Sequence, residues 1–476
     1  MALTLVSSSA SVAVTGWAKN TLTIFQIMIR STLIACLLAG VTALASERPN
    51  VIVIMADDLG YRDLGFQGSE VVKTPHLDAL AKNGVIFTDG HAAASVCSPS
   101  RAGFITGRYQ QRFGHEANCP RGKQGMVTSE YTMGQAFQSI GYKTYMIGKW
   151  HLGNLEEMYP TQRGFDSFWG LREGSRGFFY KEGKEKFGNY HSIEENGKHV
   201  AFEGFLTDRM TDAGIAMIEA NKQDPFFMFL SYTAPHTPLQ ATPEDKAKAN
   251  GNAYHALIQN MDDNIGRLVA YLEENKMREN TVIWFLSDNG GTVGSASNYP
   301  LNGKKGVEFE GGHRVPFIVN WPAKIKGGQR FDGLTSAMDI FPTSFKLAGG
   351  KETPNKLDGV DLLPYLVGEK SGDPHATLYW RKLEQAAIRH GDWKMIRGEG
   401  LPEMLYKMGD DTSELNDVAK QHPEKVQELG KMITDWEKEL VEPLWQEGKG
   451  FIKVRYKKNI EYRDAEMVKP TLGAKK

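Results

Sequence analysis

Cysteine is scarce in this chain: Cys36, Cys97 and Cys119 are the only three among 476 residues. Three cysteines do not make a disulfide framework, and we expect Cys36 to leave with a targeting segment and Cys119 to be a free thiol. Net charge is nearly absent as well, because 56 Lys and Arg face 57 Asp and Glu. Without an overall field, nucleic acid and anionic membranes are not expected partners. Any anionic substrate must therefore be attracted by local cations.

The N-terminal apolar run is too short for a stable membrane span, which needs about 20 apolar residues. It covers 33–44, follows Met28-Ile29-Arg30 and ends in Ala-Leu-Ala. A charged start, a short apolar stretch and small residues at its end describe a secretory signal peptide. We therefore expect a leader and signal peptide over 1–45, with translation starting at Met1 or Met28. The protein would be exported to the periplasm or secreted.

The remaining chain suffices for one large α/β domain and a smaller one, since single cores rarely grow past about 300 residues. Apolar runs at 51–55, 225–232 and 281–286 predict strands that are buried in a parallel-type sheet. From about residue 372 the pattern changes to short alternating strands and then an amphipathic helix, as in a small α+β subdomain. The predicted divisions are a large domain over 46–371, a subdomain over 372–448 and a basic tail over 449–476.

Oxygen-bearing side chains follow two of these apolar runs. Asp57 and Asp58 come after the first run, and Asp288 and Asn289 come after the third. The carboxyl ends of strands are where open α/β sheets bind ligands. Adjacent carboxylates repel unless a cation lies between them, and hard oxygen donors suit Ca²⁺ or Mg²⁺ rather than zinc. The alternative for Asp57 and Asp58 is a solvated turn, because Asp-Asp-Leu-Gly is also good turn composition.

Cys97 opens the stretch Cys-Ser-Pro-Ser-Arg-Ala-Gly-Phe-Ile-Thr-Gly-Arg. A strand-like segment before it, and Pro99 within it, predict a tight turn and a helix that begins near Pro99. The thiol would face the positive end of the helix dipole, with Arg101 one turn on, and both would stabilise an anion. The pattern indicates an anion-binding nucleophile, and a buried structural cysteine is the alternative.

Two histidines follow predicted strands. The strand predicted over 142–147 leads to Lys149 and His151, which would point to the same side of an extended strand end. His236 stands between two prolines after 225–232, and a rigidly held imidazole that titrates near neutrality suits a general acid. The alternatives are a surface lysine beside a core histidine, and a loop histidine without a role.

The stretch from Pro160 to about His199 is polar, dotted with glycine and without periodicity. Such long loops in a compact domain are usually functional or disordered. Arg172 and Arg176 stand among aromatic residues, a combination that suits stacking on sugar rings and pairing with anionic groups. We expect a substrate loop here, although an ordinary exposed surface is the alternative.

Together these motifs resemble those of the type I sulfatases. The chain has Cys-x-Pro-Ser-Arg followed by Thr-Gly-Arg, and then three further blocks in family order: Gly-Lys-Trp-His at 148–151, Pro-His-x-Pro at 235–238 and Gly-Lys-Lys-Gly…Glu-Gly-Gly-x-Arg-Val-Pro at 303–316. The resemblance covers nearly the whole mature chain. It implies an alkaline-phosphatase-like α/β sandwich with a large mixed central sheet flanked by helices. A small C-terminal α+β subdomain would add a four-stranded antiparallel sheet and one helix.

The resemblance also implies the chemistry of the site. Cys97 would be converted to formylglycine, an aldehyde hydrated to a gem-diol, by a formylglycine-generating or radical sulfatase-maturing enzyme. A Ca²⁺ ion, with Mg²⁺ less favoured, would be held by Asp57, Asp58, the modified Cys97, Asp288 and Asn289. One hydroxyl of the hydrate would attack sulfur, and the second would be deprotonated so that its collapse expels sulfate.

The remaining site residues come from the same resemblance. Charge on the sulfate oxygens would be balanced by Arg101, Lys149 and Lys305. His236 would protonate the leaving alcohol, and His151 would be the base for the second hydroxyl. His313 occupies a position where the family has an aliphatic residue or threonine, which indicates either substrate contact or local packing.

The implied activity is hydrolysis of sulfate esters on a sulfated carbohydrate, such as a carrageenan-type galactan or a glycosaminoglycan. One alternative is a formylglycine-dependent phosphonate or phosphate ester hydrolase. A second is a non-catalytic protein that binds sulfated glycans. The retention of every expected site residue argues against the second, and the single set of metal ligands argues against a phosphate monoesterase.

Overall fold

The computed structural model describes residues 48–120, 125–180, 192–292, 294–398 and 400–447. The predicted leader, signal peptide and basic tail lie outside these residues, as does part of the predicted substrate loop. Among the described helices, none is both long enough and apolar enough to cross a membrane.

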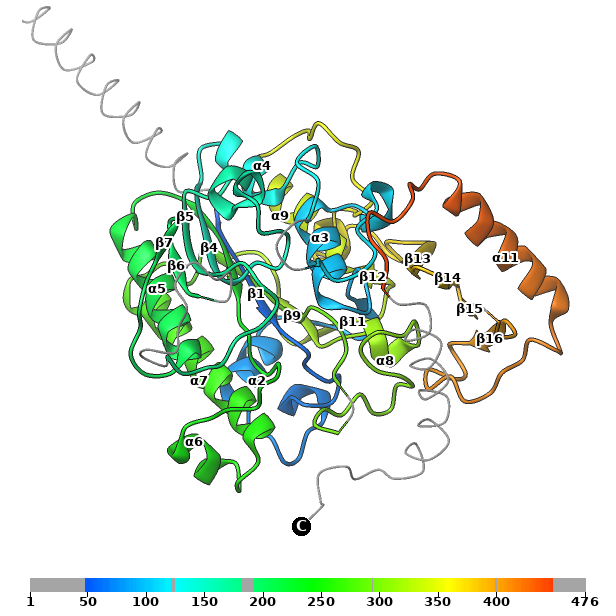
Figure 1. The fold of residues 1–476 in the computed structure, drawn as a ribbon, viewed down its shortest axis with the longest axis horizontal. Helices are drawn as coiled ribbons and strands as arrows, with labels where there is room; N and C mark the ends of the chain where they lie inside the picture. Colours follow the sequence, from blue (N-terminus) through cyan, green and yellow to red (C-terminus); the bar gives the residue numbers. More distant parts are fainter. Residues whose placement is uncertain (1–47, 121–124, 181–191, 293, 399, 448–476) are drawn as a thin grey trace, which may run out of the picture. The chain divides into compact units, whose positions relative to one another are not determined.

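A ten-stranded mixed sheet forms the centre of the fold (Figure 1). Its order is β11-β2-β10-β9-β1-β8-β4-β5-β6-β7. The strands are β1 (Asn50–Ala56), β2 (Val85–Phe87), β4 (Lys143–Lys149), β5 (Ser167–Leu171), β6 (Glu194–Glu195), β7 (Lys198–His199), β8 (Phe226–Ser231), β9 (Thr281–Ser287), β10 (Phe317–Asn320) and β11 (Gln329–Phe331). The four neighbours β9, β1, β8 and β4 run parallel, and β10 is antiparallel to β9. The apolar runs in the sequence are these buried parallel strands.

Helices cover both faces of the sheet because the side chains of each strand alternate. Val51, Val53 and Met55 of β1 belong to a core shared with α3, α4 and α9. Ile52 and Ile54 belong to a second core shared with α2, α5 and α7. The helices are α2 (Pro75–Lys82), α3 (Cys97–Thr106), α4 (Met133–Ser139), α5 (Leu206–Ala220), α6 (Pro243–Lys248), α7 (Ala253–Glu274), α8 (Glu310–His313), α9 (Ile340–Leu347), α10 (Leu363–Leu366) and α11 (Pro423–Glu437).

Short elements complete this part of the chain. A two-stranded sheet pairs β3 (Gly90–His91) with β12 (Thr335–Ser336). The single turns of 3₁₀ helix are η1 (Gly65–Gln67), η2 (Gln110–Phe113), η3 (Glu156–Met158), η4 (Pro160–Arg163) and η5 (Ala337–Asp339).

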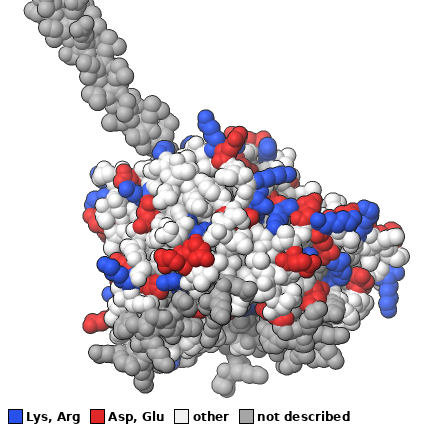
Figure 2. Space-filling view, turned by 45° about the horizontal axis from the view of Figure 1, so that its top comes forward, with Lys and Arg blue, Asp and Glu red and all other residues white. Residues whose placement is uncertain are grey.

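The C-terminal part is a separate antiparallel sheet with one helix. Its strands are β13 (Thr377–Lys382), β14 (Gln385–His390), β15 (Trp393–Arg397) and β16 (Met404–Lys407), paired in that order. Leu429 and Ile433 of α11 pack on Ile388, Met395 and Leu405 of the sheet. The predicted α/β sandwich with a four-stranded α+β addition is therefore confirmed. The side chains of both signs are interspersed on the face in Figure 2, in keeping with the near-zero net charge.

Candidate active site

The carboxyl ends of the four parallel strands meet at one place. Asp57 and Asp58 follow β1, and Asp288 and Asn289 follow β9, whose Ser287 pairs with Ala56. The backbone N–H of Asp58 donates to Oδ1 of Asp288 at 3.2 Å, and Nδ2 of Asn289 donates to Oδ1 of Asp58 at 2.8 Å. At most 3% of each of these four residues is exposed. The oxygen donors predicted from separate apolar runs thus form one buried group.

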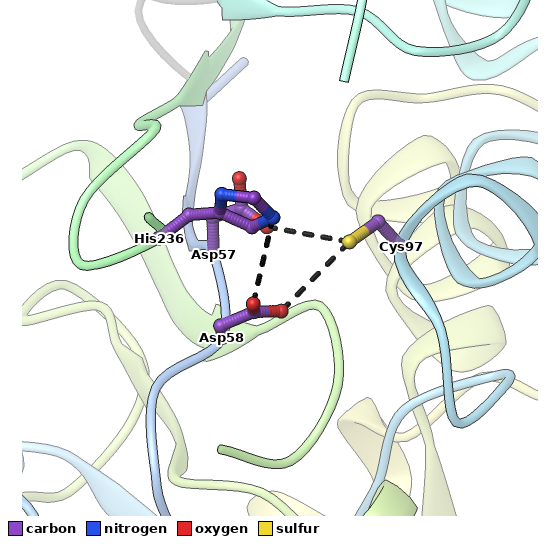
Figure 3. A group of neighbouring side chains, drawn as sticks. All are labelled: Asp57, Asp58, Cys97 and His236. Carbon is purple, nitrogen blue, oxygen red and sulfur yellow. Dashed lines mark hydrogen bonds and ion pairs between the residues drawn. The ribbon is translucent and has the colours of Figure 1, made fainter. Parts of the chain in front are cut away.

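Cys97 faces this group from across the site (Figure 3). Its Sγ lies 3.5 Å from Oδ1 of Asp57 and 3.8 Å from Oδ1 of Asp58. The helix begins at Cys97 itself and not near Pro99, because the preceding residue is still extended (φ −141°, ψ 154°) while Pro99 lies in the first turn. The prediction of the helix was right, and its start was two residues too late.

Three cations surround the carboxylates. Lys149 Nζ donates to Oδ2 of Asp57 at 2.7 Å, and Arg101 donates to Oδ2 of Asp288 from Nε at 3.0 Å and from Nη2 at 2.8 Å. Lys305 Nζ lies 2.5 Å from Oδ1 of Asp58 and 2.8 Å from Sγ of Cys97. Three carboxylates and three cations therefore balance in a buried site, where an unpaired charge would be costly.

The balance of charges changes the pKa of the groups at the centre. Burial alone would raise the pKa of Asp57, but the neighbouring Lys149 ammonium holds that pKa well below its ordinary value. Burial raises the pKa of the Cys97 thiol far above its ordinary value, and the nearby carboxylates of Asp288 and Asp57 add to this effect. The thiol is therefore protonated at neutral pH. The helix dipole and Arg101 would favour a thiolate, but burial raises the pKa of the unmodified thiol more than Lys149 and Lys305 lower it.

His236 lies on the same side as the two aspartates in Figure 3. Its Nδ1 lies 2.6 Å from the Thr237 carbonyl oxygen, so Nδ1 carries a proton that it donates there. Its Nε2 lies 3.5 Å from Oδ2 of Asp58. The ring is thus held by its backbone neighbour with Nε2 facing the site, and 18% of its side chain is exposed.

His151 is buried beside the same cations. Burial, together with Lys149 and Arg101, lowers its pKa well below the ordinary value, so the ring is neutral at neutral pH. The strand ends at Lys149, and His151 has φ 57°, so the extended geometry that predicted both side chains on one side does not continue to residue 151. Gly174 lies against the ring, since a Cβ there would stand 2.5 Å from a ring carbon.

The donor set fits a hard divalent cation. Carboxylates of Asp57, Asp58 and Asp288 and the amide of Asn289 supply oxygen, and these are the ligands that Ca²⁺ and Mg²⁺ take. Oδ1 of Asn289 is buried and has no hydrogen-bond partner among the described residues, which leaves an oxygen for such an ion. Asp57, Asp58, Cys97 and His236 each place a ligand atom within 4.8 Å of the others. The residues could therefore hold a metal ion.

The predicted substrate residues lie outside this group. Arg172 pairs with Glu194 at 3.1 Å and donates to the Asn154 carbonyl at 2.8 Å. Arg176 lies over the ring of Phe202 and is 9% exposed. Both guanidinium groups thus have protein partners, and their contact with substrate stays a prediction.

His313 is completely buried, and its contact with substrate stays a prediction. Its ring stacks on Trp380 with centroids 4.1 Å apart, and its Nδ1 lies 3.0 Å from Nδ1 of His91. Local packing, the alternative for this departure from the family pattern, is what the structure shows.

A polar cluster beside Cys97 went unnoticed in the sequence. Ser98 Oγ lies 2.6 Å from Nε2 of His115 and 3.1 Å from Sγ of Cys119, and donates to the His151 carbonyl at 2.7 Å. It ties the residue after Cys97 to the backbone of His151. Cys97 and Cys119 are both free. No motif signals this cluster, because its members are brought together only by the fold.

Comparisons with known proteins agree with this geometry. The model of the sulfatase family matches residues 49–350, and that of the N-sulphoglucosamine sulphohydrolase C-terminal region matches 304–441. The chain is 31% identical over 394 residues to N-acetylgalactosamine-6-sulfatase of Mus musculus, covering 78% of this chain and 75% of the relative. It is 32% identical over 381 residues to arylsulfatase G of Rattus norvegicus, covering 70% and 71%. The solved structure of Ps i-CgsB in complex with k-i-k-neocarrahexaose superposes with a TM-score of 0.80 at 34% identity, covering 89% of this chain and all of that one.

Proposed function

The chain belongs to the sulfatase family, whose members are sulfuric ester hydrolases, and we propose that its substrate is a sulfated carbohydrate. The observation that carries this proposal is the buried group of three cations and three carboxylates around Cys97. Ps i-CgsB, which shares the fold at 34% identity, was solved with a neocarrahexaose. The mouse relative is named for a sulfated amino sugar. Both support a sulfated glycan as substrate, and the signal peptide expected from the sequence supports export to the periplasm or medium.

Two groups would complete the site. Calcium, held by Asp57, Asp58, Asp288, Asn289 and the modified residue 97, would polarise a sulfate oxygen as a Lewis acid. Formylglycine, made from Cys97 by a maturing enzyme, would supply the attacking oxygen in its hydrated form. The protonated, buried thiol explains why unmodified Cys97 is a poor nucleophile.

The cations of the chain bind and orient the sulfate group. Arg101 and Lys149 are completely buried, whereas 15% of the Lys305 side chain is exposed. Lys305 Nζ already lies 2.8 Å from the Sγ of residue 97, within reach of a group bound there. Preorganised N–H donors in a dry site stabilise the charge that develops in the transition state, and they need little reorganisation.

The two histidines move protons at opposite steps. His236 donates a proton from Nε2 to the departing alcohol, because its Nδ1 proton is held by the Thr237 carbonyl. His151 accepts a proton, because its ring is neutral at neutral pH, and its lowered pKa makes it a weaker base than a free imidazole. Its Nδ1 is buried and has no hydrogen-bond partner among the described residues.

The test is sulfate release by protein whose conversion at residue 97 has been verified by mass spectrometry. Sulfated oligosaccharides of the carrageenan and glycosaminoglycan types are compared with 4-nitrophenyl sulfate and a phenylphosphonate ester, and Cys97→Ala is the matched control. We expect turnover of at least one sulfated oligosaccharide that Cys97→Ala lacks. Faster hydrolysis of the phosphonate would favour a phosphonate ester hydrolase, and no sulfate release from any substrate would overturn the proposal.

A further inference from the structure

The segment that follows Lys305 is anchored at several points near the active site. The Gly306 N–H donates to the carbonyl of Ser95, two residues before Cys97, at 2.7 Å. The chain then enters α8, and the carbonyl of Gly312 accepts from the N–H of Gly290 at 2.9 Å. Only four residues separate Lys305 from the start of α8. The position of α8 therefore constrains where the Lys305 side chain can reach.

Lys394 of the C-terminal sheet contacts α8 directly. Its Nζ lies 2.8 Å from a carboxylate oxygen of Glu310 and 2.8 Å from one of Glu414. The same Nζ lies 3.2 Å from Nε2 of His313. We name Glu310, His313, Lys394 and Glu414 the α8 cluster, and at most 1% of each of these residues is exposed. Lys394 belongs to β15, and in Figure 1 α8 lies on the side of the central sheet that is toward the C-terminal sheet.

Glu414 holds the first turn of α8 in a second way. One of its carboxylate oxygens accepts from the backbone N–H of Glu310 at 2.7 Å, while the other pairs with Lys394. Burial raises the pKa of Glu414 to about 7, and Lys394 opposes that rise. The ammonium of Lys394 thus stands between two buried carboxylates that would otherwise repel each other.

His313 extends the α8 cluster back toward the strand before Cys97. Nε2 of His313 lies 3.2 Å from Lys394 Nζ, which can only donate, and 3.3 Å from the Glu308 carbonyl oxygen, which can only accept. We assign Nε2 as the acceptor of the shorter contact, which places the ring proton on Nδ1. That proton is donated to Nδ1 of His91, whose Nε2 then donates to Asp89 at 2.9 Å. Burial lowers the pKa of His313 well below its ordinary value, in agreement with a neutral ring. An aliphatic residue or threonine at position 313 could not form this chain.

We propose that Lys394 is a positioning residue for Lys305, so that the C-terminal sheet helps to place the ammonium group that binds sulfate. The inference rests on the proposed function, because Lys305 is given its role there. Removing Lys394 takes away the ammonium between Glu310 and Glu414, and among the described residues only Glu310 then keeps a cation, the Arg314 guanidinium at 3.1 Å. Removing one partner of a buried pair is strongly destabilising. The repulsion between the two carboxylates displaces α8, and the short connection carries the displacement to Lys305.

A double-mutant cycle on kcat/KM for 4-nitrophenyl sulfate tests the proposal. Lys394→Met, Lys305→Ala and the double variant are compared with the wild type. We expect Lys394→Met to lower kcat/KM about 10- to 100-fold, but less than about 3-fold when Lys305 is already alanine, because coupled residues are not additive. Equal factors in both backgrounds would show that Lys394 acts independently of Lys305 and would overturn the proposal.

Leu429→Ala is the matched control for a loss of stability alone. Leu429 is buried in the core between α11 and the C-terminal sheet, away from α8. Leu429→Ala should lower Tm while kcat/KM stays within about 2-fold of the wild type, because a distant substitution does not couple energetically to Lys305. If Leu429→Ala lowers kcat/KM as much as Lys394→Met does, a general weakening of the subdomain explains both, and the proposal is wrong.

Two further measurements test the proposal if Lys394→Met does not fold or if the preparation has no sulfatase activity. Glu414→Gln removes one charge at nearly constant volume, and we expect a smaller fall in kcat/KM that also requires Lys305. A crystal structure of either variant, even with residue 97 unconverted, should show Lys305 Nζ moved out of hydrogen-bond reach of Asp58. An unmoved Nζ overturns the positioning role, whereas an inactive wild type overturns only the proposed function.

Discussion

Two buried ionic clusters lie close together in this protein and differ in what their polar atoms still lack. Around Cys97, Oδ1 of Asn289 and Nδ1 of His151 are buried without hydrogen-bond partners among the described residues. In the α8 cluster the single ammonium of Lys394 has three partners of its own. The cluster around Cys97 therefore has polar atoms available for a ligand, whereas the ammonium of the α8 cluster is already bound by protein groups.

This difference matters because both clusters satisfy a simple rule for a metal site. His91, Glu310 and His313 place ligand atoms as close together as Asp57 and its neighbours do. In the α8 cluster, however, Lys394 already supplies a cation beside Glu310 and His313. Buried acidic and imidazole groups alone thus do not identify a metal site, because lysines lie within 2.8 Å of carboxylates in both clusters.

The largest effect should follow from the one residue that reacts. Cys97→Ala leaves the surrounding charges paired, and so it should fold while kcat for any sulfate ester falls by about 10⁴-fold or more, the scale of losing a nucleophile. Initial rates with 4-nitrophenyl sulfate, together with Tm, check this. Residual activity within 10-fold of the converted wild type would remove residue 97 from the proposed reaction.

Replacing one lysine in each cluster should separate activity from stability. Lys305→Ala removes a donor aimed at the ligand and should lower kcat/KM about 10²- to 10³-fold. Lys394→Met should cost about 3–5 kcal/mol of unfolding free energy, because it removes the ammonium that lies between two buried carboxylates. Urea unfolding and kinetics on both variants measure the contrast. If Lys394→Met lowers the unfolding free energy less than Lys305→Ala does, the α8 cluster does not have the structural role proposed for it.

Calcium should distinguish the clusters next. At 100 times its dissociation constant, calcium should stabilise the wild type by about 2.7 kcal/mol through linkage. Asp58→Asn removes a proposed calcium ligand and should lose this calcium-dependent gain in stability. His91→Gln changes the other group of buried side chains and should keep the gain. Urea unfolding with and without calcium gives the increments. Loss of the increment in His91→Gln alone would place the metal among His91, Glu310 and His313.

A smaller effect should appear in the dependence of stability on pH. Burial lowers the pKa of His115 to about 3, so between pH 6.5 and 3 the unfolded chain binds a proton that the folded chain does not. The stability from His115 is therefore complete above about pH 6.5 and declines as the pH falls, by about 2 kcal/mol at pH 5.

Unfolding free energies at pH 5 and pH 7.5 measure this decline. His115→Gln should reduce the slope of the unfolding free energy against pH by the amount that corresponds to about one proton. The side chain of His422 is 43% exposed, and His422→Gln should leave most of the slope unchanged. An unchanged slope in His115→Gln would show that His115 takes up its proton in the folded state.

Much of the active site could be predicted because its residues stand in short motifs at the ends of apolar runs. Asp57 and Asp288 each come one residue after a buried strand and Lys149 is the last residue of β4, and parallel pairing then brings them together. The start of α3 was misplaced by two residues, since local patterns do not reveal which residue first becomes helical. The contacts of His313 could not be predicted because its neighbour Lys394 is 81 residues away in the chain.

The sequence by itself determined the buried strands and the oxygen donors that follow two of them, because both depend on periodicity and on spacing within a few residues. The resemblance of its motifs to those of the sulfatases supplied the sandwich fold and the cations around residue 97. Only the tertiary structure decided which charges face a ligand and which face one another. Lys305 and Lys394 are both lysines near buried carboxylates, and no local pattern separates them. The packing of the C-terminal sheet against α8 does, because it surrounds one ammonium with partners and leaves the other beside residue 97.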